Sequence, residues 1–79
     1  MTRAPSGRYI LYGTSACHLC EIAEGMLGGR GVAFDKVDIS TSDELFERYG
    51  VRIPVLQRPD GRELGWPFSG TELAEFLAL

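Results

Sequence analysis

Residues 10–27 read ILYGTSACHLCEIAEGML and carry the clearest structural pattern of the chain. It begins with a short run of apolar and aromatic residues, which is typical of a buried strand. After a loop at residues 14–16, apolar side chains recur at helical spacing and predict one face of a helix, formed by Leu19, Ile22, Ala23, Met26 and Leu27. The two cysteines of the chain, Cys17 and Cys20, stand at the start of that helix with the single histidine, His18, between them.

The composition is that of one small folded domain. The 79 residues are 44% hydrophobic and 24% charged, which fits a globular protein and not a collagen-like, disordered or membrane protein. The net charge is −3 and the arginines are scattered, so neither nucleic acid nor a membrane surface is expected as a partner. Residues 1–7 are interpreted as a flexible tail because they lack an apolar period, and residues 8–79 as a single domain.

The start of the chain has no apolar segment long enough for a secretory signal, and no run of about 18 apolar residues follows it. A cytoplasmic location is therefore the expectation. Thiols are kept reduced in that compartment, so a close pair of cysteines is expected to be catalytic or metal-binding and not a permanent structural disulfide.

Three further strands are predicted downstream. Residues 32–39 are apolar at intervals and predict a second strand, and residues 52–57 predict a third. A Pro-Asp-Gly turn then leads into a short fourth strand at residues 62–64, which forms a hairpin with the third.

Two further helices are predicted from their capping patterns. Glycines at positions 28, 29 and 31 end the first helix. Thr41 and Glu44 have the spacing of a capping box, and the apolar face that follows ends at Gly50 and consists of Leu45, Phe46 and Tyr49. Ser69 and Glu72 repeat this spacing before a last helix that carries Leu73, Phe76 and Leu77. The order β-α-β-α-β-β-α predicts a small α/β fold with helices on both faces of a four-stranded sheet.

A C-x-x-C pair also forms half of many zinc sites, but a structural zinc site needs four ligands. The chain has no cysteine or histidine beyond Cys17, Cys20 and His18, and His18 is badly placed to complete a tetrahedron with both thiols. No metal site is therefore expected.

A redox role explains why both thiols stand at a helix start. A thiolate there meets unpaired N–H groups and the positive end of the helix dipole, which lower a thiol pKa from about 8.5 to roughly 3.5–7.5. We expect Cys17 to be the attacking thiolate and Cys20, one turn into the helix and less exposed, to be the resolving thiol. The alternative to a redox role is that both cysteines are simply small apolar residues of the core. His18 either stabilises the Cys17 thiolate, which makes the pair more oxidising, or faces solvent with little effect.

The segments YGTSACHLC and RIPVL resemble the thioredoxin superfamily and, within it, short glutaredoxin-like proteins. The resemblance covers residues 8–79 and implies a minimal thioredoxin-like fold with a four-stranded mixed sheet and three helices. It also implies that Pro54 follows a cis peptide bond and faces the cysteines. From the residues alone, the alternative is an edge-strand proline without a cis bond. Ile53 would then offer its backbone N–H and C=O groups to an extended substrate or to glutathione.

Glutaredoxins also resemble one another in a glutathione site, from which this chain departs. Glutaredoxins have a basic residue before the cysteines, where this chain has Thr14 and Ser15. The Pro-Tyr of their C-P-Y-C motif is replaced by His18 and Leu19. Ser69, Gly70 and Thr71 replace paired aspartates at the last helix, where exposed N–H groups still suit a carboxylate. The resemblance implies that these three residues contact glutathione as a cosubstrate, and no tightly bound cofactor is expected.

The comparison with thioredoxin itself is also incomplete. No tryptophan precedes Cys17, and no carboxylate lies in the first strand to accept a proton. Glu21 and Glu24 are nearby in the helix and are expected to be exposed charges. Trp66 either packs with Phe68 at the start of the last helix or lies exposed beside the cysteines as a substrate platform.

These features predict a monomeric dithiol oxidoreductase that acts on a disulfide-containing protein or a glutathione mixed disulfide. Two alternatives remain. One is an iron–sulfur carrier in which Cys17 from two chains and two glutathione thiols hold a cluster. The other is a thioredoxin-fold adaptor that binds a partner protein along Ile53 and Pro54 without turnover.

Overall fold

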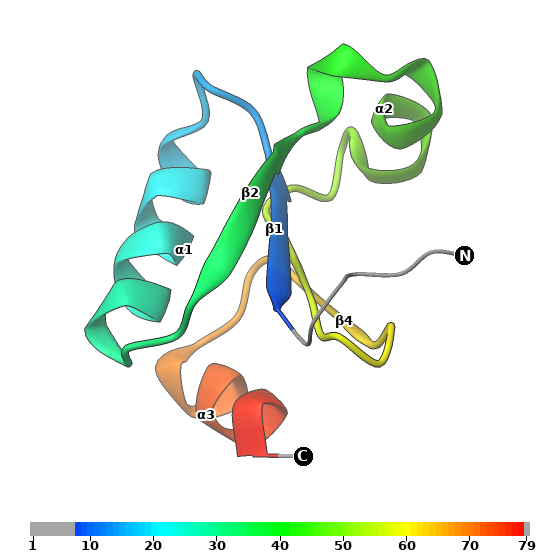
Figure 1. Ribbon diagram of the computed structural model, residues 1–79. Helices are drawn as coiled ribbons and strands as arrows, with labels where there is room; N and C mark the ends of the chain where they lie inside the picture. The colour runs from blue at the N-terminus through cyan, green and yellow to red at the C-terminus, as the bar shows by residue number, and fades with distance from the viewer. Residues whose placement is uncertain (1–7, 79) are drawn as a thin grey trace.

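A computed structural model of the chain describes residues 8–78 (Figure 1). The predicted tail, residues 1–7, and the last residue lie outside the described part. The elements follow in the order β1 (Tyr9–Gly13), α1 (His18–Gly29), β2 (Phe34–Asp38), the 3-10 turn η2 (Ile39–Thr41), α2 (Asp43–Tyr49), β3 (Val55–Gln57), β4 (Glu63–Gly65) and α3 (Gly70–Ala78). The predicted α/β class and the order of strands and α-helices are confirmed.

The four strands form one mixed sheet in the order β2-β1-β3-β4. Strands β1 and β2 are parallel, with Gly13 opposite Asp38, while β3 runs antiparallel to both β1 and β4. The β1-α1-β2 crossover therefore brings the carboxyl ends of β1 and β2 to the edge of the sheet where α1 begins (Figure 1). Strand β3 begins only after Pro54, so it is shorter than the predicted residues 52–57.

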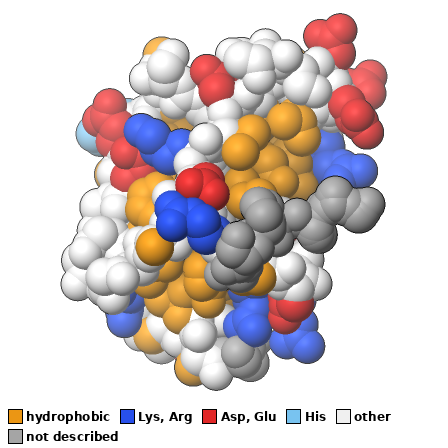
Figure 2. All heavy atoms as spheres, viewed as in Figure 1, with side chains coloured by type: hydrophobic (Ala, Val, Ile, Leu, Met, Phe, Trp, Pro, Cys, Tyr) orange, Lys and Arg blue, Asp and Glu red, His pale blue; other side chains and the backbone are white. Residues whose placement is uncertain are grey.

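Side chains alternate across each strand, and the sheet therefore has two apolar faces. Helices α1 and α3 cover one face around the buried residues Leu11, Ala23, Leu27, Leu56, Phe68, Leu73 and Phe76. Helix α2 covers the other face, where the buried residues are Tyr12, Ile39, Tyr49 and Val55. Acidic side chains gather on the outside of α2, at the upper right of Figure 2.

The buried face of α1 differs from the predicted one. Cys20, Ala23 and Leu27 are its buried residues, whereas Leu19 and Ile22 are exposed. The prediction that Leu19 and Ile22 share one face with Ala23 and Leu27 is therefore wrong. The stripe that meets the sheet passes through Cys20, and the two apolar residues lie beside it.

A Schellman motif ends α1, as its glycines predict. The N–H of Gly31 donates to the carbonyl of Gly28, and the N–H of Val32 donates to that of Leu27, both at 3.1 Å. Gly31 has a φ of 70°, a conformation that glycine adopts without steric cost.

The cap of α2 lies one residue beyond the predicted Thr41. Ser42 is the N-cap, and its Oγ accepts a hydrogen bond from the N–H of Leu45 at 3.3 Å. Thr41 instead ends η2 and donates its hydroxyl to the carbonyl of Asp38 at 2.8 Å. The unexpected turn η2 displaces the helix start. Phe46, assigned to the apolar face, is exposed.

The predicted capping box of α3 is confirmed. The N–H of Ser69 donates to Oε1 of Glu72 at 2.8 Å, and the N–H of Glu72 donates to Oγ of Ser69 at 3.0 Å. Ser69 and Glu72 are only three residues apart, so the capping-box pattern in the sequence is enough to locate this helix start.

Candidate redox site

Cys17 and Cys20 form a disulfide across the first turn of α1, with their Cα atoms 5.2 Å apart. Cys17 is the N-cap of the helix, and its Sγ accepts a hydrogen bond from the N–H of Cys20 at 3.0 Å. Cys17 is partly exposed, whereas Cys20 is only 2% exposed. The two sulfur atoms therefore differ in environment, and the outer one lies at the positive end of the helix dipole.

Gly13, the last residue of β1, allows the inner sulfur to pack against the strand. A Cβ atom at this position would lie 2.7 Å from Sγ of Cys20, which is too close for a real contact. Gly13 was not among the site residues predicted from the sequence. A glycine at the end of a strand that leads into a C-x-x-C is the signal that could have indicated it.

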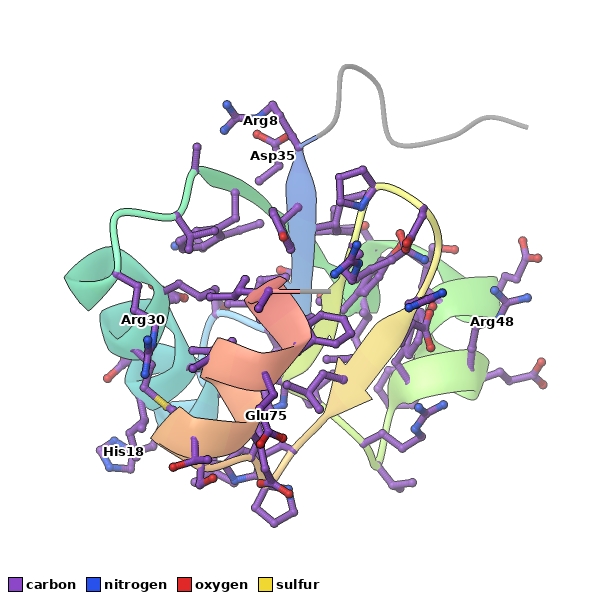
Figure 3. The ribbon with its side chains drawn as sticks, turned by 90° about the horizontal axis from the view of Figure 1, so that it is seen from below. Arg8, His18, Arg30, Asp35, Arg48 and Glu75 are labelled. Carbon is purple, nitrogen blue, oxygen red and sulfur yellow. A yellow bond between two sulfur atoms is a disulfide. The ribbon has the colours of Figure 1, made fainter. Side chains whose placement is uncertain are left out.

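His18 lies beside the disulfide and points away from the body of the protein (Figure 3). Its side chain is 83% exposed, and Nδ1 is 3.9 Å from Oε1 of Glu21. This is the solvent-facing position in the first turn that the sequence allowed as one of two alternatives.

The peptide bond between Ile53 and Pro54 is cis, and Pro54 is buried. The carbonyl of Pro54 accepts a hydrogen bond from the N–H of Trp66 at 3.1 Å. The N–H of Ile53, expected to pair with a substrate, donates to the carbonyl of Tyr49 at 3.1 Å. A substrate strand that uses this N–H must first displace the Tyr49 carbonyl.

Trp66 is partly buried against the core between α1, α3 and the sheet. Its ring meets that of the buried Phe68 edge to face, with the ring centroids 4.9 Å apart. The peptide bond between Trp66 and Pro67 is also cis, which was not predicted from the sequence. The packing alternative for Trp66 is therefore the one observed.

Ser69, Gly70 and Thr71 do not lie with the cysteines. The guanidinium of Arg30, directly after α1, donates to the carbonyl of Gly70 at 2.9 Å, so α3 begins beside the C-terminal end of α1 (Figure 1). Helix α1 has 12 residues, and a rise of about 1.5 Å per residue separates its two ends by about 18 Å. The capping box also engages two of the N–H groups at this helix start.

A cavity of about 410 Å³ opens beside Cys20, at the carboxyl ends of β1 and β2. Its charged lining residues are Glu21, Glu24, Lys36 and Asp38. Glu21 is exposed, as expected. The expectation for Glu24 is wrong, because its side chain is only 33% exposed and Oε1 lies 3.5 Å from Nζ of Lys36. The contact with β2 depends on tertiary structure, which the helix sequence does not contain.

Within residues 8–78, no group of three or more histidine, cysteine, aspartate and glutamate side chains is arranged to hold a metal ion. No helix in the same part of the chain has the length and apolar character needed to cross a membrane.

The sheet order, the three α-helices that cover it and the cysteine pair at the start of α1 define a thioredoxin-like fold with a dithiol site. Residues 8–78 match the family model described as glutaredoxin-like domain (DUF836), and the chain belongs to this family. The fold and the family expected from the sequence are thereby confirmed. The family and the cysteine pair support a thiol–disulfide oxidoreductase-like role.

Solved structures agree with this assignment. The chain is 42% identical to protein XcR50 from X. campestris, with a TM-score of 0.83, over 89% of this chain and 95% of that chain. Protein Ne2328 from Nitrosomonas europaea is 22% identical, with a TM-score of 0.69, over 96% of both chains. The glutaredoxin (grx-1) from Archaeoglobus fulgidus is 20% identical, with a TM-score of 0.69, over 92% of this chain and 88% of that chain. The last two likenesses show the fold alone. No curated protein matches the sequence.

Proposed function

We propose that the protein is a thiol–disulfide oxidoreductase in which Cys17 attacks a substrate disulfide and Cys20 resolves the intermediate. The observation that carries this proposal is the asymmetry of the pair. Cys17 caps α1 and is partly exposed, while Cys20 is buried one turn further along the helix. A helix N-terminus favours the thiolate form of the outer cysteine, which is the nucleophile in thiol exchange.

The reaction balances as two exchanges. The Cys17 thiolate attacks one sulfur of the substrate disulfide, a mixed disulfide forms, and the other substrate sulfur leaves as a thiolate that takes up a proton. The Cys20 thiolate then attacks Sγ of Cys17, which releases the second substrate thiol and forms the Cys17–Cys20 disulfide. The substrate gains two electrons, and an external thiol reductant returns the protein to its dithiol form.

We infer that disulfide-containing proteins are better substrates than glutathione mixed disulfides. Ser69, Gly70 and Thr71 lie at the far end of α1, so their backbone groups do not contribute to binding a tripeptide held at Cys17. Leu19 and Ile22 are exposed apolar residues of α1 near the pair, and they suit contact with a protein surface. We further propose that the protein acts as a monomer in the cytoplasm.

The test compares two substrates and three forms of the protein. The substrates are a peptide with an internal disulfide, recycled by dithiothreitol, and a glutathionylated peptide, recycled by glutathione and its reductase. We expect the native protein to turn over the peptide disulfide faster. Cys17→Ser should lose all turnover, and Cys20→Ser should stop at the mixed disulfide. Turnover by Cys17→Ser equal to the native rate would contradict the proposal.

A glutathione cycle would give a different pattern. Turnover of the glutathionylated peptide that is retained in Cys20→Ser and exceeds turnover of the peptide disulfide would assign the protein a monothiol glutathione-dependent activity. That result would overturn the inferred preference for protein disulfides while leaving Cys17 as the nucleophile.

A further inference from the structure

In the resolving step the Cys20 thiol must be deprotonated, and this depends on the groups around it. Cys20 is 2% exposed and packs against Gly13, yet it must lose its proton before it can attack the mixed disulfide. An apolar environment disfavours the charged thiolate, because burial in a low dielectric raises the free energy of a charge. A proton acceptor within reach of this thiol would remove the difficulty.

The cavity at the ends of β1 and β2 provides the route to such an acceptor. It is about 410 Å³ in volume, and Cys20 is one of its lining residues. Glu24 also lines it and follows Cys20 by four residues on α1. Side chains at this spacing are neighbours on one side of a helix, with their Cβ atoms about 5–6 Å apart. The thiol and the carboxylate therefore share one cavity as well as one helix face.

Lys36 holds Glu24 on the cavity side of the helix. Its Nζ lies 3.5 Å from Oε1 of Glu24, and it stands opposite Leu11 in the parallel pairing of β1 and β2. Lys36 thus reaches from the sheet to α1 across the cavity. Figure 2 shows basic and acidic side chains meeting at the upper left, over the first half of α1.

The other carboxylates of the cavity are less suited to this task. Glu21 is 71% exposed and faces the side chain of His18. Asp38 accepts hydrogen bonds from the hydroxyl and the N–H of Ser40, at 2.7 and 2.9 Å, and these bonds hold the pKa of its carboxyl below the ordinary value. A carboxylate stabilised in this way is a weaker base. Glu24 combines partial burial, helical proximity to Cys20 and a cation that positions it.

We propose that Glu24 accepts the proton of Cys20 during the resolving step and that Lys36 positions its carboxylate. The inference rests on the proposed function. In this step the Cys20 S–H bond breaks, the proton moves to the Glu24 carboxylate, and the electron pair left on sulfur attacks Sγ of Cys17. The departing substrate thiolate is then protonated from solvent, and Glu24 returns its proton to solvent through the cavity opening.

The charged residues that line this cavity come from two elements, Glu21 and Glu24 from α1 and Lys36 and Asp38 from β2. With Glu24→Gln the proton must go to water or hydroxide, so the rate should rise steadily with pH and approach the native rate in alkaline solution.

The experiment separates the two steps with 5,5′-dithiobis(2-nitrobenzoate) as the substrate. One coloured thiolate leaves the reagent when the Cys17 thiolate of the reduced protein attacks it, and a second leaves when Cys20 resolves the adduct. General base catalysis contributes about 10²–10⁴-fold, so we expect Glu24→Gln to slow the second release by roughly 10–100-fold near pH 7. The first release should keep its rate, and the difference in the second should shrink as pH rises.

Three further variants make the result specific. Glu21→Gln removes a neighbouring carboxylate of the same helix and should leave both releases close to native. Glu24→Asp keeps a carboxylate on a shorter side chain and should restore part of the rate. Lys36→Met leaves the carboxylate without its partner and should slow the second release less than Glu24→Gln does.

The outcomes distinguish this inference from the proposed function. Two releases in the native protein, with a second release that Glu24→Gln leaves unchanged or slows equally at every pH, would overturn the assignment of Glu24. A single release by the native protein, or loss of the first release in Cys20→Ser and not in Cys17→Ser, would overturn the proposed function itself.

Discussion

Sγ of Cys20 is confined because Gly13, the last residue of β1, packs against it. Gly13→Ala would place a Cβ atom 2.7 Å from Sγ of Cys20, and the disulfide prevents that sulfur from turning aside. We expect the variant to lose about 1–3 kcal/mol of unfolding free energy in the oxidised form, as overpacked cores do. Urea unfolding measures this loss.

Gly25→Ala is the matched control for this substitution. Gly25 lies within α1, and a Cβ atom there would meet nothing within 4 Å. Alanine favours a helix interior over glycine by up to about 1 kcal/mol, so this variant should be more stable than the native protein. Equal stabilities for the two variants would contradict the close packing of Gly13 on Cys20.

Tyr49 makes the stability of the protein sensitive to alkaline pH. Burial raises the pKa of its hydroxyl from the ordinary value of 10.0 to about 12, and a hydrogen bond to the Glu63 carboxylate adds to the shift. The unfolded chain loses this proton at lower pH than the folded protein does. The free energy of unfolding should therefore fall as pH rises from about 10 to about 12.

Tyr49→Phe tests this pH dependence because it removes the titrating hydroxyl and keeps the ring that stacks on Tyr12. Urea unfolding between pH 9 and 11.5 should show a shallower decline for the variant. Parallel declines for the two proteins would show that Tyr49 does not contribute to the alkaline loss.

At the scale of elements, α3 depends on its capping box. Ser69→Ala removes the oxygen that accepts the N–H of Glu72, and loss of an N-cap costs about 1 kcal/mol, within a range of about 0.5–2. Thr71→Ala, an exposed position in the same first turn, is the control and should change the unfolding free energy less. A larger loss of unfolding free energy in Thr71→Ala than in Ser69→Ala would show that the capping box is not formed in solution.

Local patterns explain which elements were predictable. The α3 cap and the glycine end of α1 depend on residues within a few positions of one another, and both appear where the sequence places them. The start of α2 was placed one residue early because η2 has no distinct sequence signal. The assignment of Leu19 and Ile22 to the same face as Ala23 and Leu27 was wrong because apolar spacing alone does not say which row of a helix meets the sheet.

The candidate site was less predictable than the fold because its parts come from separate elements. The cysteines are local and were identified from their spacing. The contact of Gly13 with Cys20, the pairing of Glu24 with Lys36 and the position of α3 at the far end of α1 all arise from tertiary packing. The resemblance to glutaredoxins assigned Ser69, Gly70 and Thr71 to a glutathione site, and the structure places them at the end of α1 away from the cysteines.

At the scale of the whole molecule, the proposed function predicts a colourless monomer. Light scattering during gel filtration should give the mass of one chain for the purified protein, with or without added glutathione. A coloured dimer would instead favour the iron–sulfur alternative, because a cluster shared by two Cys17 residues requires two chains.

The role of Cys17 as the nucleophile is tested by the intact mass of the two single-cysteine variants after exposure to a peptide disulfide. We expect that Cys20→Ser gains the mass of one substrate thiol, mapped to Cys17, and that Cys17→Ser remains unmodified on the same timescale. A substrate adduct that forms on Cys20 in Cys17→Ser as fast as on Cys17 in Cys20→Ser would contradict it.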